Sequence, residues 1–119
     1  MNFVVGNIYI ILCQWIQNPH DKICLCVCDK RKWFFWVNSN PRFHGIGQVL
    51  LPANCHGAIY HDSYLDLSGI KTVSLQEEAT ARDRGQISSL MSATVKVALS
   101  APISRLPDFQ RLHALNSLP

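Results

Sequence analysis

Residues 22–39, KICLCVCDKRKWFFWVNS, contain two apolar runs joined by a short charged segment. Residues 23–28 alternate Ile, Leu and Val with Cys, and residues 33–37 are almost wholly aromatic or β-branched. Such side chains fit the pleated surface of a sheet, and a polar turn between two such runs is typical of a β-hairpin. Because neither run contains much polar surface, we expect both faces of the hairpin to be covered. This places the hairpin at the centre of a closed or strongly curled sheet.

Shorter apolar runs, separated by Gly, Pro, Asn and Asp, predict further strands on both sides of the hairpin. The expected strands are residues 8–16, 48–51, 58–67 and 70–75, and residues 76–84 are expected to form a loop or one helical turn. Apolar residues at a spacing near 3.6 then predict a helix that begins after Ser88 or Ser89, runs to Leu99 and is ended by Pro102.

These elements favour a single mostly β (α+β) domain. We expect a small barrel of five to seven strands with a C-terminal helix over residues 1–103. Residues 104–119 are expected to add a short helix or a loosely ordered tail to the same domain. A chain of 119 residues is long enough for one such core.

The composition bears on the partners. Hydrophobic residues make up 48% of the chain and charged residues 16%, which argues against disorder and is compatible with a surface covered by a second copy. Residues 1–60 hold five Lys or Arg against two Asp, whereas the remaining residues hold six charges of each sign. The excess near the hairpin favours an anionic partner such as RNA or DNA, although a basic solvated turn would look the same.

Three of the five cysteines, Cys24, Cys26 and Cys28, occupy alternate positions of one predicted strand. Residues at this spacing point to the same face with Cα atoms about 6.5–7 Å apart, too far for an easy disulfide. A straight strand also does not wrap around a zinc ion, so we expect buried, reduced thiols and no metal or other cofactor. This pattern is typical of the cytoplasm, and we expect neither a signal peptide nor a membrane-spanning segment.

Five segments, in order, resemble the PemK/MazF toxin family over about residues 5–100. The sequence VGNIY at residues 5–9 resembles the family's first strand, and residues 23–28 occupy the place of its next strand. The other segments that match its pattern are residues 35–39 (FWVNS), 59–66 (IYHDSYLD) and 85–88 (GQIS) with the helix that follows.

The resemblance implies an SH3-like barrel that forms a homodimer, cuts single-stranded RNA without metal and is neutralised by a small antitoxin protein. Ser39 falls at the family's catalytic hydroxyl, whereas Leu65 stands where the family has an arginine. Cleavage through the 2′-hydroxyl needs a base, an acid and positive charge near the phosphate. Two function classes therefore stay open, an endoribonuclease toxin and a non-catalytic module that binds nucleic acid or protein.

Three residues are the catalytic candidates. Ser39 takes the hydroxyl position, Arg42 can supply the missing charge, and His20 in the first loop can move protons because histidine titrates near neutral pH. The alternative for each is a solvated loop residue, and Ser39 can instead bond its own backbone. The residues expected to contact RNA lie in the basic turn and the following polar loop; they are Lys30, Arg31, Lys32, Asn38 and Asn40.

Two further groups have open roles. The aromatic residues 33–36 can stack nucleobases, at most two of them on one face, although packing in a core or at a dimer interface is favoured. Asp62, Tyr64 and Asp66 share one face of a predicted strand. Because unpaired carboxylates are costly to bury, we expect that face to be wet or to pair with the basic turn.

Overall fold

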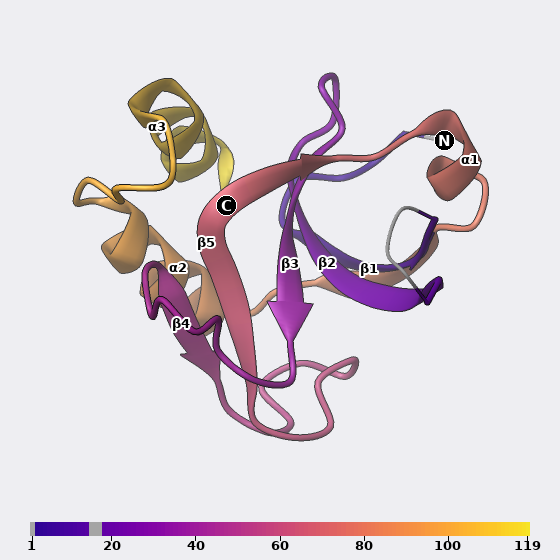
Figure 1. Cartoon of the computed structure of the whole chain (residues 1–119), viewed down its shortest axis with the longest axis horizontal. Coiled ribbons are helices and arrows are strands. Elements are labelled where there is room, and N and C mark those ends of the chain that lie inside the picture. The colour runs from indigo at the N-terminus through magenta and orange to yellow at the C-terminus, as the bar shows by residue number, and fades with distance from the viewer. Residues whose placement is uncertain (1, 15–17) are drawn as a thin grey trace.

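Six antiparallel strands form one sheet in the order β4-β5-β3-β2-β1-β6 (Figure 1). The computed structural model describes residues 2–14 and 18–119. The strands and helices of this part, in chain order, are β1 Asn7–Cys13, β2 His20–Cys28, β3 Trp33–Asn38, β4 Gln48–Leu51, β5 Ser63–Thr72, α1 Leu75–Glu78, β6 Arg82–Gln86, α2 Ser89–Leu99 and α3 Asp108–Ser117. The chain is thus mostly β, as the sequence predicts.

The predicted hairpin lies in the middle of this sheet. Ile23 pairs with Val37 and Cys26 with Phe34, while β1 and β5 pair with the outer sides of β2 and β3. Most side chains on both faces of the hairpin are buried, as expected, although Trp36 on one face is partly exposed. One face, here called the helix face, packs on α2 and α3 around residues such as Leu25 and Phe35. The opposite face holds a smaller cluster around Cys24, Cys26 and Phe34. We call it the Trp36 face, because Trp36 packs against this cluster.

The expectation that three cysteines share one face is wrong for Cys28. A register shift between Cys26 and Cys28 interrupts the pairing of β2 with β3. An extra residue at a β-bulge reverses the side-chain alternation beyond it. Cys24 and Cys26 therefore lie in the cluster of the Trp36 face, and Cys28 packs in the core beneath the helices.

Several strand boundaries also differ from the prediction. The two strands expected at residues 58–67 and 70–75 are one strand, β5, whose first residue is Ser63. The first strand ends at Cys13, and residues 15 and 16, which were also expected in it, lie outside the described residues. Within residues 76–84, the expected helical turn is present as α1, but Arg82 already begins an unexpected edge strand, β6.

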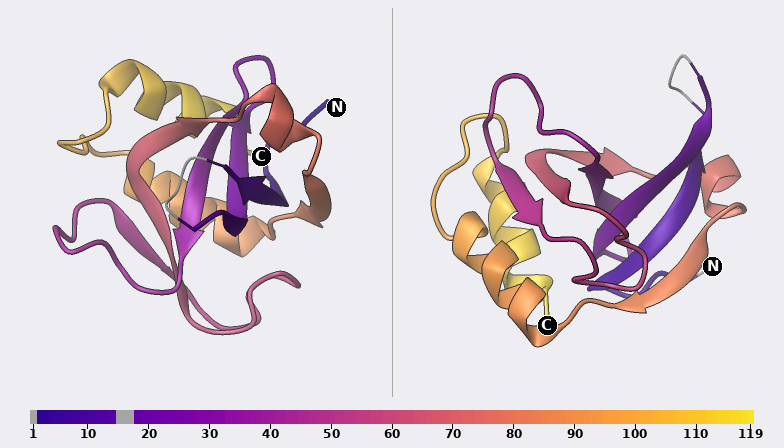
Figure 2. Two further views of the ribbon diagram at one scale, coloured as in Figure 1. Left: turned by 45° about the vertical axis from the view of Figure 1, so that its right-hand side comes forward. Right: turned by 90° about the horizontal axis from the view of Figure 1, so that it is seen from below.

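The sheet curls strongly without closing (Figure 2). Within residues 2–14 and 18–119, β4 and β6 are its two edges and have no strand partner on their outer sides. The predicted SH3-like barrel is therefore not confirmed, because the sheet is open between β4 and β6. Helices α2 and α3 lie together on one side of the molecule, and α1 lies on the other side (Figure 1).

The helices agree with the sequence prediction. Ser88 is the N-cap of α2, its hydroxyl accepting a hydrogen bond from the Met91 N–H, and the helix ends at Leu99. The C-terminal segment forms a helix, α3, rather than a loose tail. No helix in the described part of the chain is long and apolar enough to cross a membrane.

Candidate nucleic-acid interface

The three catalytic candidates lie at one end of the central hairpin. His20 opens β2, and Ser39 and Arg42 follow the last residue of β3, Asn38. All three are exposed. The Nδ1–H of His20 donates to the Asn18 carbonyl oxygen at 2.8 Å, and no hydrogen bond among the described residues joins the three side chains to one another. The fold thus brings them to a common rim without forming a bonded catalytic group.

The basic turn lies at the opposite end of the hairpin. Trp33, which follows the turn, and Asn38 are five residue steps apart in β3, which at about 3.3 Å per residue makes roughly 16 Å. Lys32 Nζ forms a 2.5 Å ion pair with Glu78, and the Arg31 guanidinium lies 4.9 Å from the centre of the Trp33 ring. Lys30 is exposed. The residues expected to contact RNA therefore fall into two separate groups.

The group at the rim, formed by Asn38 and Asn40, also includes a lysine that was not predicted from the sequence. The Lys22 ammonium donates a 2.7 Å hydrogen bond to the side-chain oxygen of Asn38. Burial lowers the pKa of Lys22, while nearby Asp66 opposes this shift and the positive charge of Arg42 adds to it. Asn38 thus holds Lys22 in place, and Asn40 lies exposed in the loop beyond it.

Asp66 is buried, contrary to the expectation of a wet face. It is only 4% exposed, and its Oδ1 accepts hydrogen bonds from the Gln48 amide at 2.8 Å and from the Ser68 N–H at 2.9 Å. Burial alone would raise the pKa of Asp66, but the hydrogen bonds from Ser68 and Gln48 and the charge of Arg42 lower it overall. A charged carboxylate is thus accommodated beside the rim. Asp62, by contrast, is exposed and lies before β5.

A row of paired residues connects this carboxylate to the centre of the sheet. Gln48, Asp66, Trp36, Cys24 and Tyr9 are opposite one another on β4, β5, β3, β2 and β1. Directly opposed residues in antiparallel strands share one face. Trp36 therefore lies in the middle of the Trp36 face and is partly exposed.

Trp36 is accompanied by two ammonium groups. Lys22 Nζ lies 5.2 Å and Lys71 Nζ 5.1 Å from the centre of its ring. Both distances are within the range of cation–π attraction. The other three aromatic residues of the predicted run, Trp33, Phe34 and Phe35, are buried in the two clusters. Of the four aromatic residues, only Trp36 thus offers a ring that a ligand can reach. The positive charges of Lys22 and Lys71 beside this ring suit an anionic ligand.

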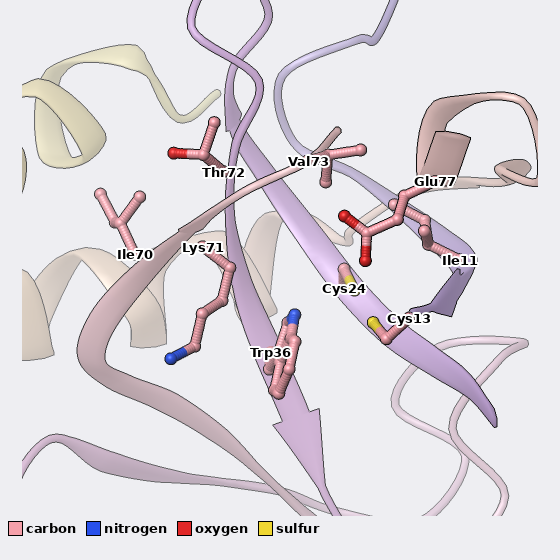
Figure 3. Close-up of a pocket in the computed structure, with 9 residues that line it drawn as sticks. All are labelled: Ile11, Cys13, Cys24, Trp36, Ile70, Lys71, Thr72, Val73 and Glu77. Atoms are coloured by element: carbon pink, nitrogen blue, oxygen red, sulfur yellow. The ribbon is translucent and has the colours of Figure 1, made fainter. Parts of the chain in front are cut away.

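A pocket of about 320 Å³ lies next to Trp36 (Figure 3). This is the size of a small-molecule site. Its lining comes from β1, β2, β3, the end of β5 and α1, and the residues are Ile11, Cys13, Cys24, Trp36, Ile70, Lys71, Thr72, Val73 and Glu77. The walls are mainly apolar, with Lys71 and Glu77 as charged groups. Lys71 and Glu77 come from outside the hairpin, so no local sequence signal pointed to them.

The two thiols that line this pocket, those of Cys13 and Cys24, are poorly suited to act as nucleophiles. Burial raises the pKa of Cys13 to about 11, with a further contribution from the Glu77 carboxylate, and burial also raises the pKa of Cys24. A protonated, buried thiol is a poor nucleophile and a poor metal ligand. All five cysteines are free, and no group of three metal-binding side chains occurs among residues 2–14 and 18–119.

Neither the models of known protein families nor the curated proteins match this chain. The interpretation of the site therefore depends on its own residues.

Proposed function

We propose that the protein binds single-stranded RNA across the Trp36 face. The observation that carries the proposal is the reachable ring of Trp36, with the ammonium groups of Lys22 and Lys71 each about 5 Å from its centre. Proteins that bind single strands combine aromatic rings, on which bases stack, with positive charges that contact the phosphates. Arg42 and the Lys22–Asn38 pair extend this positive surface toward the rim.

Flexible single strands suit this arrangement better than a duplex does. The bases of a duplex are stacked on one another, whereas those of a single strand can turn out onto an aromatic side chain. Lys71 can leave the ring and pair with a phosphate, because its side chain is long and partly exposed, whereas Lys22 can meet a phosphate from its place beside Asn38. A base then takes the place of the Lys71 ammonium on the ring.

The test is fluorescence anisotropy with a labelled 2′-O-methyl RNA, which cannot be cut through its 2′-hydroxyl. Trp36→Leu should weaken binding about tenfold, since stacking contributes roughly 1–3 kcal/mol per base. Phe109→Leu is the matched control, because Phe109 is a 63% exposed aromatic residue on α3 and should leave RNA affinity unchanged. Absence of salt-sensitive binding by the wild type, or equal affinity of the Trp36→Leu protein, would exclude the proposal.

Endoribonuclease activity is a second candidate, favoured by the common position of His20, Ser39 and Arg42 at the rim. In this reaction the 2′-oxygen attacks the adjacent phosphorus and the bond to the 5′-oxygen breaks, leaving a cyclic phosphate and a 5′-hydroxyl. His20 moves the protons, Arg42 stabilises the charge on the phosphate, and Ser39 positions it. The resemblance to PemK/MazF toxins supports this candidate, and with it a homodimer and an antitoxin partner.

Cleavage is tested with unmodified single-stranded RNA in the presence of a metal chelator. The wild type should cut the RNA and stop growth when expressed alone, and His20→Ala, Ser39→Ala and Arg42→Ala proteins should do neither. Intact RNA after long incubation with the wild type would rule out the enzyme and leave the binding function.

A further inference from the structure

The pocket beside Trp36 has an acceptor group at a defined place in its wall. Glu77 is only 2% exposed, yet its side chain lines the pocket, and its carboxylate points toward Cys24 and Cys13 (Figure 3). Its Oε1 accepts a 3.1 Å hydrogen bond from the Ser74 N–H, and its Oε2 accepts a 3.4 Å hydrogen bond from the Gln14 N–H. These backbone donors hold the carboxylate in one orientation.

A carboxylate fixed in this way can select among nucleobases. Each oxygen of an ionised carboxylate can accept more than one hydrogen bond, and such a group donates none. Guanine presents two adjacent donors on its Watson–Crick edge, the N1–H and the N2 amino group. Adenine and cytosine each place an acceptor beside their amino group, and uracil places acceptors on both sides of its N3–H. Guanine is therefore the base whose edge matches the two oxygens of a carboxylate.

The rest of the pocket suits the same ligand. Ile11, Ile70 and Val73 provide apolar walls for the faces of a flat base, and Trp36 provides an aromatic one. Lys71 lines the pocket too, at the side of Trp36 (Figure 3), where a phosphate attached to the bound nucleoside can reach its ammonium group. Lys71 can thus pair with the phosphate of a nucleotide, and Glu77 can accept from the donor edge of the base of the same nucleotide.

We propose that this pocket binds a single guanine base of the RNA strand, with the Watson–Crick edge of the base against Glu77. The inference rests on the proposed RNA binding and adds the identity of one base. It also predicts that bases outside the pocket contribute affinity without selectivity.

The test uses four labelled 2′-O-methyl pentanucleotides that differ only in the central base, which is G, A, C or U between flanking uridines. The wild type should bind the G oligomer at least about tenfold more tightly than the others, as good bidentate base contacts do elsewhere. Glu77→Gln keeps the shape and an acceptor oxygen but places a donor against the guanine. It should reduce binding of the G oligomer to the level of the others and leave their affinities unchanged.

Glu78→Gln is the matched control. Glu78 is the adjacent carboxylate, is also buried, and pairs with Lys32 instead of lining the pocket. Its variant should keep the preference for G. Loss of that preference in the Glu78→Gln protein alone would overturn the assignment to Glu77.

The outcomes separate the two proposals. If no oligomer binds, the proposed function fails and the base pocket fails with it. If all four bind the wild type equally, RNA binding stands and the guanine pocket is wrong. The comparison of oligomers on the wild type needs no variant, so a folding defect in Glu77→Gln does not affect it.

Discussion

The amide of Gln48 donates a 2.8 Å hydrogen bond to Oδ1 of Asp66, and the two residues are directly opposite each other on β4 and β5. Ser68 donates to the same oxygen from its backbone and its hydroxyl. This arrangement joins the edge strand β4 to its neighbour β5 through one buried carboxylate. It depends on the carboxylate being charged, because hydrogen bonds to a charged acceptor are the stronger ones.

The stability of the protein should therefore fall in acid partly through Asp66. Its pKa is lowered in the folded protein, so its contribution is present above the pKa of the unfolded chain and is lost as the pH falls through the folded value. Asp66→Asn should reduce the free energy of unfolding by about 1–2 kcal/mol at pH 7. The difference from the wild type should shrink below about pH 4, as urea titrations at several pH values can measure.

Asp29→Asn is a suitable control for this prediction, because Asp29 is exposed in the β2–β3 turn. Its effect at pH 7 should be smaller than that of Asp66→Asn. A difference between Asp66→Asn and the wild type that is the same at pH 3 and pH 7 would contradict the role given to the Asp66 charge.

Replacing the lysines beside Trp36 should change the salt dependence of RNA binding. Each phosphate contact to a single strand contributes about −0.7 to the slope of log affinity against log salt concentration. Lys22→Met and Lys71→Met should each make the slope about 0.7 less steep and weaken binding severalfold, in anisotropy titrations over a range of salt concentrations. Lys96→Met, on α2, should leave the slope unchanged. A slope unaffected by either of the first two variants would exclude phosphate contacts at these residues.

The turn before β4 should lose stability when a side chain is added at Gly47. Its φ is +66°, and a Cβ there would lie 3.2 Å from backbone atoms of Leu67 and Ser68. Gly45 also has a positive φ, +69°, but nothing lies within 4 Å of an added Cβ. We expect Gly45→Ala to cost about 1 kcal/mol from backbone strain alone and Gly47→Ala distinctly more.

Gly57→Ala should be nearly neutral, because Gly57 has open space for a Cβ and needs no left-handed backbone. Urea denaturation of the three variants gives the comparison. Equal losses for Gly45→Ala and Gly47→Ala would show that the backbone of β5 moves away without cost.

The cysteines should differ sharply in reactivity. Cys24 and Cys26 are fully buried, and burial raises the pKa of both, that of Cys26 to about 12. Cys55 is only partly buried. Iodoacetamide at pH 8 should therefore modify Cys55 first in the native protein, while all five thiols react in denaturant, as peptide mass spectrometry can show. Modification of Cys24 as fast as Cys55 would mean that the Trp36 face opens readily.

The predictions that held depend on local pattern. The alternating and aromatic runs around residues 22–39 predicted a central hairpin, because a run without polar relief must be covered on both faces. Ser88 and the apolar spacing after it predicted α2, since a capped amphipathic turn is a local property.

The features that were missed or wrong depend on contacts between distant segments. Arg82–Gln86 has no apolar alternation and becomes a strand only because β1 offers its free edge. The bulge that moves Cys28 to the helix face is a matter of register between β2 and β3. Asp66 is buried because Gln48 and Ser68 satisfy its charge, which a count of charges along the chain does not reveal.

The amino-acid sequence by itself thus determined that this chain forms a mostly β domain around one aromatic hairpin, since strand periodicity and turn residues act over short distances. Only the tertiary structure decided which aromatic ring stays reachable and what surrounds it. Trp36 acquires Lys71 from β5 and Glu77 from α1 because the sheet curls and the chain returns over its face. A site assembled from segments some forty residues apart is specified by packing, and no local pattern contains it.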